Sequence, residues 1–204
     1  EADVSLYLTW LRGCESLASL YDLVNHHRLV AFSQCVAGLQ LLHTPVRPAL
    51  HCYQPRISEI LLSAGGFSDL QQHQDWRALQ SSLNTVVFWI PLEDIRLQNS
   101  RLAVWPGSHL NGLAAARKNP FGHEIAAPLS ESDAVAPLLS KGSVIALSSL
   151  MVHKTLVPPE CEGLRFAIGI RHSDLGCPEH ISRGFQGGIK TTTVYDYDRL
   201  FTDE

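Results

Sequence analysis

The sequence predicts a single, mainly β domain of the sandwich or jelly-roll class, with helices at its amino end. Three observations support this fold class. Apolar residues in the first 45 positions recur at intervals near three and four, as in amphipathic helices. The later apolar runs are short and rich in β-branched and aromatic residues, and turn signals separate them. A chain of 204 residues with 45% hydrophobic positions suits one buried core and is short for two domains.

The amino-terminal part, residues 1–45, is predicted to be helical. Between Val4 and Val24 the leucines follow a helical spacing that is interrupted at Gly13, which indicates one or two helices. A second helical pattern runs from Leu29 to Leu42. Pro45 and Pro48 follow, and the pattern changes there from helix to sheet.

The predicted core, residues 46–172, consists of short strands separated by turns such as Pro106-Gly107 and Lys141-Gly142. Strand-like runs cover Leu50 to Leu62, Leu83 to Leu92, Leu102 to Trp105, Val144 to Leu147 and Leu164 to Arg171. In the last of these, the two-residue period of a strand places Arg165 and Arg171 on one face. Two arginines on one face require an anionic partner or solvent. The tail, residues 173–204, shows no clear pattern.

The composition limits the kinds of partner and the location that we expect for this chain. The net charge is −4, from 16 basic and 20 acidic residues, and no run of like charges is long, so a nucleic-acid partner is not expected. Apolar stretches such as Thr85 to Leu92 are far shorter than the roughly 20 residues of a membrane helix. The cysteines form no Cys-x-x-Cys pair, and no secretory pattern opens the chain, so reduced thiols and a cytoplasmic location are expected. The oligomeric state cannot be predicted.

Three residues form a candidate metal site. His73 and Asp75 are two residues apart, so in an extended conformation both side chains leave the same face. His153 follows the apolar run from Val144 to Val152, which is expected to deliver it at the end of a strand. Two histidines and one carboxylate form the facial triad of non-haem Fe(II) oxygenases, which leaves three positions for co-substrate and O2. A lone His-x-Asp is a weak signal, because many such pairs lie on solvated loops.

2-Oxoglutarate would occupy two of those positions, and its distal carboxylate would then require a fixed cation. Arg165 suits this role, because its planar guanidinium binds a carboxylate through two hydrogen bonds and keeps its charge. Arg171 is the reserve candidate. The alternative for Arg165 is an ordinary ion pair, for example with Glu162.

An ordered series of motifs resembles the phytanoyl-CoA dioxygenase family of Fe(II)/2-oxoglutarate enzymes, between about Tyr53 and Arg171. The series comprises His73-Gln74-Asp75-Trp76, Gln80, Ser82-Leu83-Asn84, Trp89-Ile90-Pro91-Leu92-Glu93 and Val104-Trp105-Pro106-Gly107-Ser108-His109. This order is far more specific than the triad alone. The resemblance implies a double-stranded β-helix, a cupin-like jelly roll.

The resemblance also implies roles for single residues. His73, Asp75 and His153 become the iron ligands, and Arg165 becomes the 2-oxoglutarate anchor. Thr155 matches a hydroxyl near the co-substrate and Trp89 a tryptophan of its pocket, and two further side chains, Gln80 and Asn84, are expected to face it. Because Asp75 supplies a carboxylate ligand, the implied reaction is hydroxylation of a small molecule, with 2-oxoglutarate and O2 consumed and succinate and carbon dioxide released.

Other readings remain open. A cupin-like metal-dependent isomerase or a non-catalytic binding module would share the metal ligands and need no distal arginine, and a degenerate family member would keep only the fold. His109 is a rival ligand, but it follows a turn. His51 and the remaining histidines lack a partner at ligand spacing and are expected to lie on the surface or in the core. The identity of the prime substrate is beyond the sequence.

Overall fold

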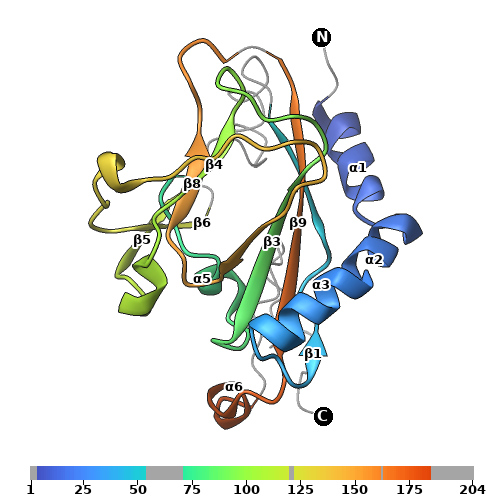
Figure 1. The fold of residues 1–204 in the computed structure, drawn as a ribbon, viewed down its shortest axis with the longest axis vertical. Helices are drawn as coiled ribbons and strands as arrows, with labels where there is room; N and C mark the ends of the chain where they lie inside the picture. The colour runs from blue at the N-terminus through green and yellow to red at the C-terminus, as the bar shows by residue number, and fades with distance from the viewer. Residues whose placement is uncertain (1–3, 54–70, 120–121, 162, 185–204) are drawn as a thin grey trace, which may run out of the picture.

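The computed structural model describes residues 4–53, 71–119, 122–161 and 163–184. Its largest sheet is antiparallel and has strand β9, Arg165–Asp174, at its centre (Figure 1). Along one side of β9 lie β1, Leu42–His43, and β2, Ala49–Tyr53, and along the other lies β3, Thr85–Pro91. Strand β7, Ile145–Ser148, pairs with β3.

Two smaller pairs of strands lie on the opposite side of the molecule from the amino-terminal helices (Figure 1). Strand β4, Arg101–Val104, pairs with β8, His153–Leu156, and β5, Ala116–Asn119, pairs with β6, Gly122–Ile125. The apolar run from Val144 to Val152 is therefore not one strand, because a turn after β7 divides it. His153 begins strand β8 instead of ending the strand before it.

Helices α1, Val4–Cys14, and α2, Ala18–Val24, confirm the predicted interruption near Gly13. The predicted helix from Leu29 to Leu42 is shorter than expected. It consists of α3, His27–Ala31, continued by the π-helical segment Phe32–Val36, and it ends where Gly38 adopts a left-handed φ of 71°. Leu42, predicted to be helical, begins strand β1. Short helices α5, Trp76–Leu79, and α6, Pro178–Ser182, and the 3-10 turns Ser108–Asn111 and Glu131–Asp133 complete the described elements.

Alternation along β3 and β9 creates two buried faces. Side chains of one parity, including Phe88 and Ile170, pack against Val24, Leu29 and other apolar residues of the amino-terminal helices. Side chains of the other parity belong to a second cluster, with Trp89, Ala167 and Leu147 among its members. All of β3 is buried because both of its faces are covered. The second face points toward the pocket described below.

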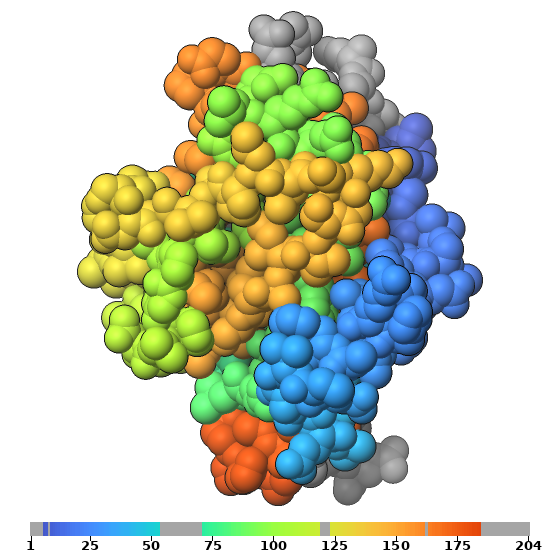
Figure 2. Space-filling view, viewed as in Figure 1, coloured from blue at the N-terminus to red at the C-terminus, as the bar shows by residue number. Residues whose placement is uncertain are grey.

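The predicted strands from Leu83 to Leu92, Val144 to Leu147 and Leu164 to Arg171 are confirmed, and β9 continues three residues further, to Asp174. Of the predicted run from Leu50 to Leu62, the part up to Tyr53 belongs to strand β2. The remainder lies outside the described residues. The segment between β6 and β7 crosses the front of the molecule (Figure 2). The expectation of a mainly β fold with flanking helices is met. No helix within the described ranges is long and apolar enough to cross a membrane.

Candidate metal centre

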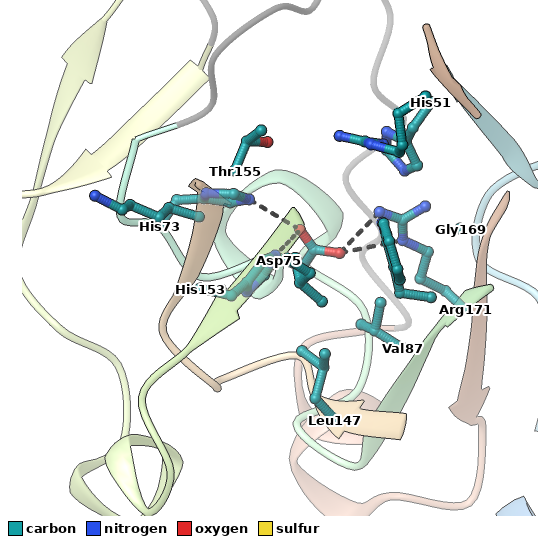
Figure 3. Close-up of a pocket in the computed structure, with 13 residues that line it drawn as sticks. His51, His73, Asp75, Val87, Leu147, His153, Thr155, Gly169 and Arg171 are labelled. Carbon is teal, nitrogen blue, oxygen red and sulfur yellow. Dashed lines mark hydrogen bonds and ion pairs between the residues drawn. The ribbon is translucent and has the colours of Figure 1, made fainter. Parts of the chain in front are cut away.

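The structure brings His73, Asp75 and His153 together. His73 and His153 lie opposite each other in an isolated antiparallel bridge, in which each backbone N–H donates to the other residue's carbonyl, at 3.0 and 3.1 Å. Asp75 follows at the start of α5. The Oδ1 atom of Asp75 lies 3.5 Å from Nε2 of each histidine, and the three ligand atoms lie within 4.8 Å of one another (Figure 3). Adjacent ligands of an octahedral ion are separated by about 3 Å. The distances from Oδ1 of Asp75 to the two imidazole nitrogens are thus slightly longer than those between adjacent ligands of a bound metal ion.

Backbone hydrogen bonds fix the orientation of both imidazoles. Nδ1 of His73 donates to the Gln71 carbonyl at 2.6 Å, and Nδ1 of His153 donates to the Met151 carbonyl at 2.9 Å. A neutral imidazole carries one proton, so this hydrogen bond leaves Nε2 of each ring with its lone pair available. Metal-binding histidines typically donate such a hydrogen bond from the ring nitrogen that does not bind the metal.

The charges of the triad also suit a metal. Burial lowers the pKa of His73, and the nearby His153 lowers it further, which favours the neutral imidazole. Burial alone would raise the pKa of Asp75, but the positive charge of the adjacent Arg171 holds it well below its usual range. Near neutral pH the site therefore offers a neutral His73 imidazole and a charged Asp75 carboxylate, the protonation states that bind metal.

A pocket opens beside the triad, between the inner faces of the main sheet and of β4 and β8 (Figure 3). Its lining combines the triad with apolar and basic side chains: His51, His73, Asp75, Val87, Trp89, Leu102, Leu147, His153, Lys154, Thr155, Arg165, Gly169 and Arg171. Lys154 is already paired, because its ammonium lies 2.8 Å from a Glu131 carboxylate oxygen. The two arginines of β9 are therefore the principal cations that face the pocket.

Arg165 is a buried cation, with only 5% of its surface exposed. Its Nε donates to the Ser100 hydroxyl at 3.1 Å, and its guanidinium lies 5.5 Å from the Trp89 ring centroid and 6.0 Å from that of Tyr53. No carboxylate of the described residues lies within ion-pairing distance; Glu162, the rival partner, lies outside them. Burial lowers the pKa of Arg165 to about 10, so the side chain remains charged at neutral pH.

Arg171, the reserve candidate, has a different partner. Its Nε and Nη2 both donate to Oδ2 of Asp75, at 3.1 and 2.9 Å. The side chains of this ion pair are only 12% and 11% exposed. Arg171 is therefore engaged at the metal end of the pocket.

The remaining predicted residues divide into two groups. Thr155 and Trp89 line the pocket, beside the triad and Arg165. Gln80 and Asn84 are absent from the lining: Gln80 is exposed at the end of α5, and the Asn84 side chain contributes to the lowered pKa of Asp174. The co-substrate roles assigned to these four residues remain predictions.

One histidine of the pocket was missed. His51, expected on the surface or in the core, lies on the pocket wall. The two-residue period of β2 offered a signal, because it places His51 on the same face as Tyr53, whose ring contacts Arg165. His109, the rival ligand, is not part of the metal cluster found among the described residues.

Comparison with known proteins agrees with this site. The sequence profile described as phytanoyl-CoA dioxygenase (PhyH) matches residues 14–156, which is more than half of the chain. This protein therefore belongs to the phytanoyl-CoA dioxygenase family. No curated protein matches the chain in sequence.

Three solved structures illustrate the likeness in fold, each at low sequence identity. The non-haem monooxygenase ThoJ, in its apo form, is 23% identical with a TM-score of 0.58, over 82% of this chain and 66% of ThoJ. The epimerase SnoN, in complex with Fe3+, α-ketoglutarate and nogalamycin RO, is 17% identical with a TM-score of 0.59, over 78% and 59%. EctD from S. alaskensis, with 2-oxoglutarate and 5-hydroxyectoine, is 15% identical with a TM-score of 0.57, over 80% and 55%. The chain thus spans between about half and two thirds of the solved structures it matches. At these identities the likeness establishes the fold alone.

Proposed function

We propose that this chain is an Fe(II)- and 2-oxoglutarate-dependent dioxygenase that hydroxylates a small molecule, built on a double-stranded β-helix and working in the cytoplasm. One observation carries the proposal. A two-histidine, one-carboxylate triad lines the same pocket as the buried cation Arg165, which has no carboxylate partner in the described part of the chain. Their chemistry matches the two ends of 2-oxoglutarate, since its keto acid end chelates a metal and its distal carboxylate requires a cation.

The residues of this chain fit both groups. His73, Asp75 and His153 would hold the iron, and the neutral imidazole of His73 and the charged carboxylate of Asp75 require no proton to leave first. When bound, iron and 2-oxoglutarate supply the oxidation chemistry, in which O2 is consumed and succinate and carbon dioxide are released. Arg165 orients the distal carboxylate through its two terminal nitrogens, because its Nε already binds Ser100.

The pocket wall supports this assignment. Trp89 stacks near the Arg165 guanidinium, and Val87, Leu102 and Leu147 provide apolar surface. Removing water from a charged hydrogen bond strengthens it, so these side chains increase the grip of Arg165 on a carboxylate. Thr155 adds a hydroxyl to the same wall.

A small-molecule prime substrate is consistent with the solved relatives. SnoN was solved with nogalamycin RO and EctD with 5-hydroxyectoine, so this fold accommodates small molecules of different chemistry. The relatives include an epimerase and a carbocyclase, SnoN and SnoK, and hydroxylation is thus one of several oxidations that such a site supports. We propose hydroxylation because the family resemblance implies this reaction when a carboxylate ligand such as Asp75 is present.

The competing function is that of a cupin-like isomerase or binding module, which would use the metal without 2-oxoglutarate. Arg165 argues against it, because this buried cation has no carboxylate partner among the described residues, and a buried charge is costly unless a ligand neutralises it.

The deciding experiment follows 14CO2 release from 1-14C-labelled 2-oxoglutarate, with Fe(II) and ascorbate but no prime substrate. The wild type should decarboxylate slowly, and Asp75→Ala and Arg165→Gln should lose at least 90% of this activity, an estimate from the loss of a ligand or anchor. Arg96→Gln, which alters an arginine of an exposed ion pair, is the matched control and should be unaffected. Release that is equal in the wild type and Asp75→Ala would reject the proposal.

A further inference from the structure

The two oxygens of the Asp75 carboxylate have different partners. Oδ1 faces both imidazoles, at 3.5 Å from each Nε2. Oδ2 accepts two hydrogen bonds from Arg171, at 3.1 Å from Nε and 2.9 Å from Nη2. Figure 3 shows the carboxylate between the imidazoles and the guanidinium, with one oxygen toward each.

This asymmetry matters because the number of open metal positions depends on it. A carboxylate binds a metal through one oxygen or through both. If Asp75 used one, the triad would fill three of six positions and leave three open. If it used both, only two would remain, enough for the keto acid end of 2-oxoglutarate and none for O2.

Arg171 reaches Asp75 because of the residue two positions before it. A Cβ on Gly169 would lie 2.6 Å from Nη1 of Arg171 and 2.6 Å from Nε2 of His51, closer than real Cβ contacts. The guanidinium therefore occupies space that any other residue at position 169 would fill. The backbone of Gly169 is not left-handed, so alanine there would act on these two side chains and not on the backbone.

Arg171 is distinct from the proposed co-substrate anchor. Arg171 lies six positions after Arg165 along β9, which is about 20 Å of extended backbone. Arg165 lies beside Ser100, Trp89 and Tyr53, whereas Arg171 contacts a metal ligand. The two arginines share a face and serve opposite ends of the pocket.

We propose that Arg171 is a positioning residue that restricts Asp75 to single-oxygen ligation and thereby keeps a metal position open for O2. The need for that third position rests on the proposed dioxygenase function. The restriction itself concerns only the metal and its ligands. Arg171 is not expected to contact the metal or the reacting atoms.

The test counts water on the metal. Mn(II) is loaded to saturation, and the relaxation of solvent protons reports how many exchangeable waters it holds. The wild type should hold three, and Arg171→Gln should hold two, a fall in relaxivity of about one third. Gly169→Ala, which retains Arg171 but displaces its guanidinium, should show the same fall. Arg171→Lys retains a donor to Oδ2 and should restore most of the lost relaxivity.

Arg165→Gln is the matched control, because it removes the same charge from the same face of β9 at the other end of the pocket, and it should retain three waters. Three waters in both Arg171→Gln and Gly169→Ala would overturn the proposal. If Arg171→Gln fails to fold or to bind Mn(II), Gly169→Ala decides alone. If neither variant can be loaded, Arg171 governs metal affinity and not ligation geometry, and the proposal is wrong. A wild type that holds three waters but binds no 2-oxoglutarate would reject the dioxygenase function and leave the role of Arg171 intact.

Discussion

Replacing Arg165 by methionine should weaken 2-oxoglutarate binding without weakening the fold. Burial lowers the pKa of Arg165 to about 10, from an ordinary value of about 12.5. A difference of this size corresponds to roughly 3 kcal/mol. At pH 7 the side chain is charged in both the folded and the unfolded protein, so the folded state bears this cost. Methionine removes the charge and retains most of the apolar stem.

Two interactions that stabilise the fold are lost with the guanidinium and offset the stability gained by removing the buried charge. The hydrogen bond from Nε to Ser100 contributes about 1 kcal/mol, and the contact of the guanidinium with the Trp89 and Tyr53 rings about 1 kcal/mol. The free energy of unfolding of metal-free Arg165→Met should therefore be equal to that of the wild type or higher by about 1 kcal/mol. Urea unfolding at pH 7, followed by circular dichroism, measures this difference.

The affinity for 2-oxoglutarate should change far more. A paired, charge-assisted hydrogen bond to a carboxylate contributes about 3 kcal/mol, which corresponds to a loss of more than about 100-fold. Calorimetric titration of the anaerobic Mn(II)-loaded protein measures it, with Arg165→Lys as the control that retains the charge but not the planar guanidinium. The reasoning is refuted if Arg165→Met is destabilised by more than about 1 kcal/mol while 2-oxoglutarate still binds, because Arg165 would then be structural.

Three further predictions concern the core, the pH dependence and the metal. Phe88→Ala should lower the free energy of unfolding by about 3 to 5 kcal/mol in urea, because Phe88 is 1% exposed and packs edge-on against Phe32 and His172. Burial lowers the pKa of His172, whose hydrogen bond to the Val24 carbonyl opposes the shift, so the unfolded chain takes up a proton that the folded protein resists. Stability should therefore fall as the pH drops below about 6.5, and less so in His172→Gln. Zn(II) at 100 times its dissociation constant should raise the free energy of unfolding by about 2.7 kcal/mol, an effect that Asp75→Ala abolishes.

Each of these has a contrary result. Phe88→Leu preserves most of the volume and should cost less than about 1.5 kcal/mol, and an equal loss in both variants would contradict a packing role. An unchanged slope of stability against pH in His172→Gln would show that another group takes up the proton. Equal stabilisation of the wild type and Asp75→Ala by Zn(II) would place the bound metal elsewhere.

The sequence predicted strand β9, which carries both arginines of the pocket, but not strand β8, which begins with His153. The alternation along Leu164 to Arg171 correctly placed Arg165 and Arg171 on one face, because the two-residue period depends only on local backbone geometry. The triad could also be predicted, because His73 and Asp75 are close in sequence and His153 offered a third ligand.

Features that depend on tertiary contacts were not predicted. The partner of Arg171 is Asp75, 96 residues away, and periodicity cannot show which of two arginines on one face lies near the metal. The turn that divides the apolar run before His153 contains no glycine or proline. The helix expected to reach Leu42 ends earlier because Gly38 adopts a left-handed conformation, although isolated glycines inside a helical pattern are often tolerated.

The most direct test of the proposed function is an anaerobic Fe(II) titration with and without 2-oxoglutarate, with Asp75→Ala alongside. The chelated complex of Fe(II) and the keto acid has a weak visible charge-transfer band. The wild type should show this band only when both components are present, and Asp75→Ala should lose most of it. A folded wild type that binds Fe(II) but shows no band with 2-oxoglutarate would contradict the dioxygenase function and favour a metal-binding protein that does not use 2-oxoglutarate.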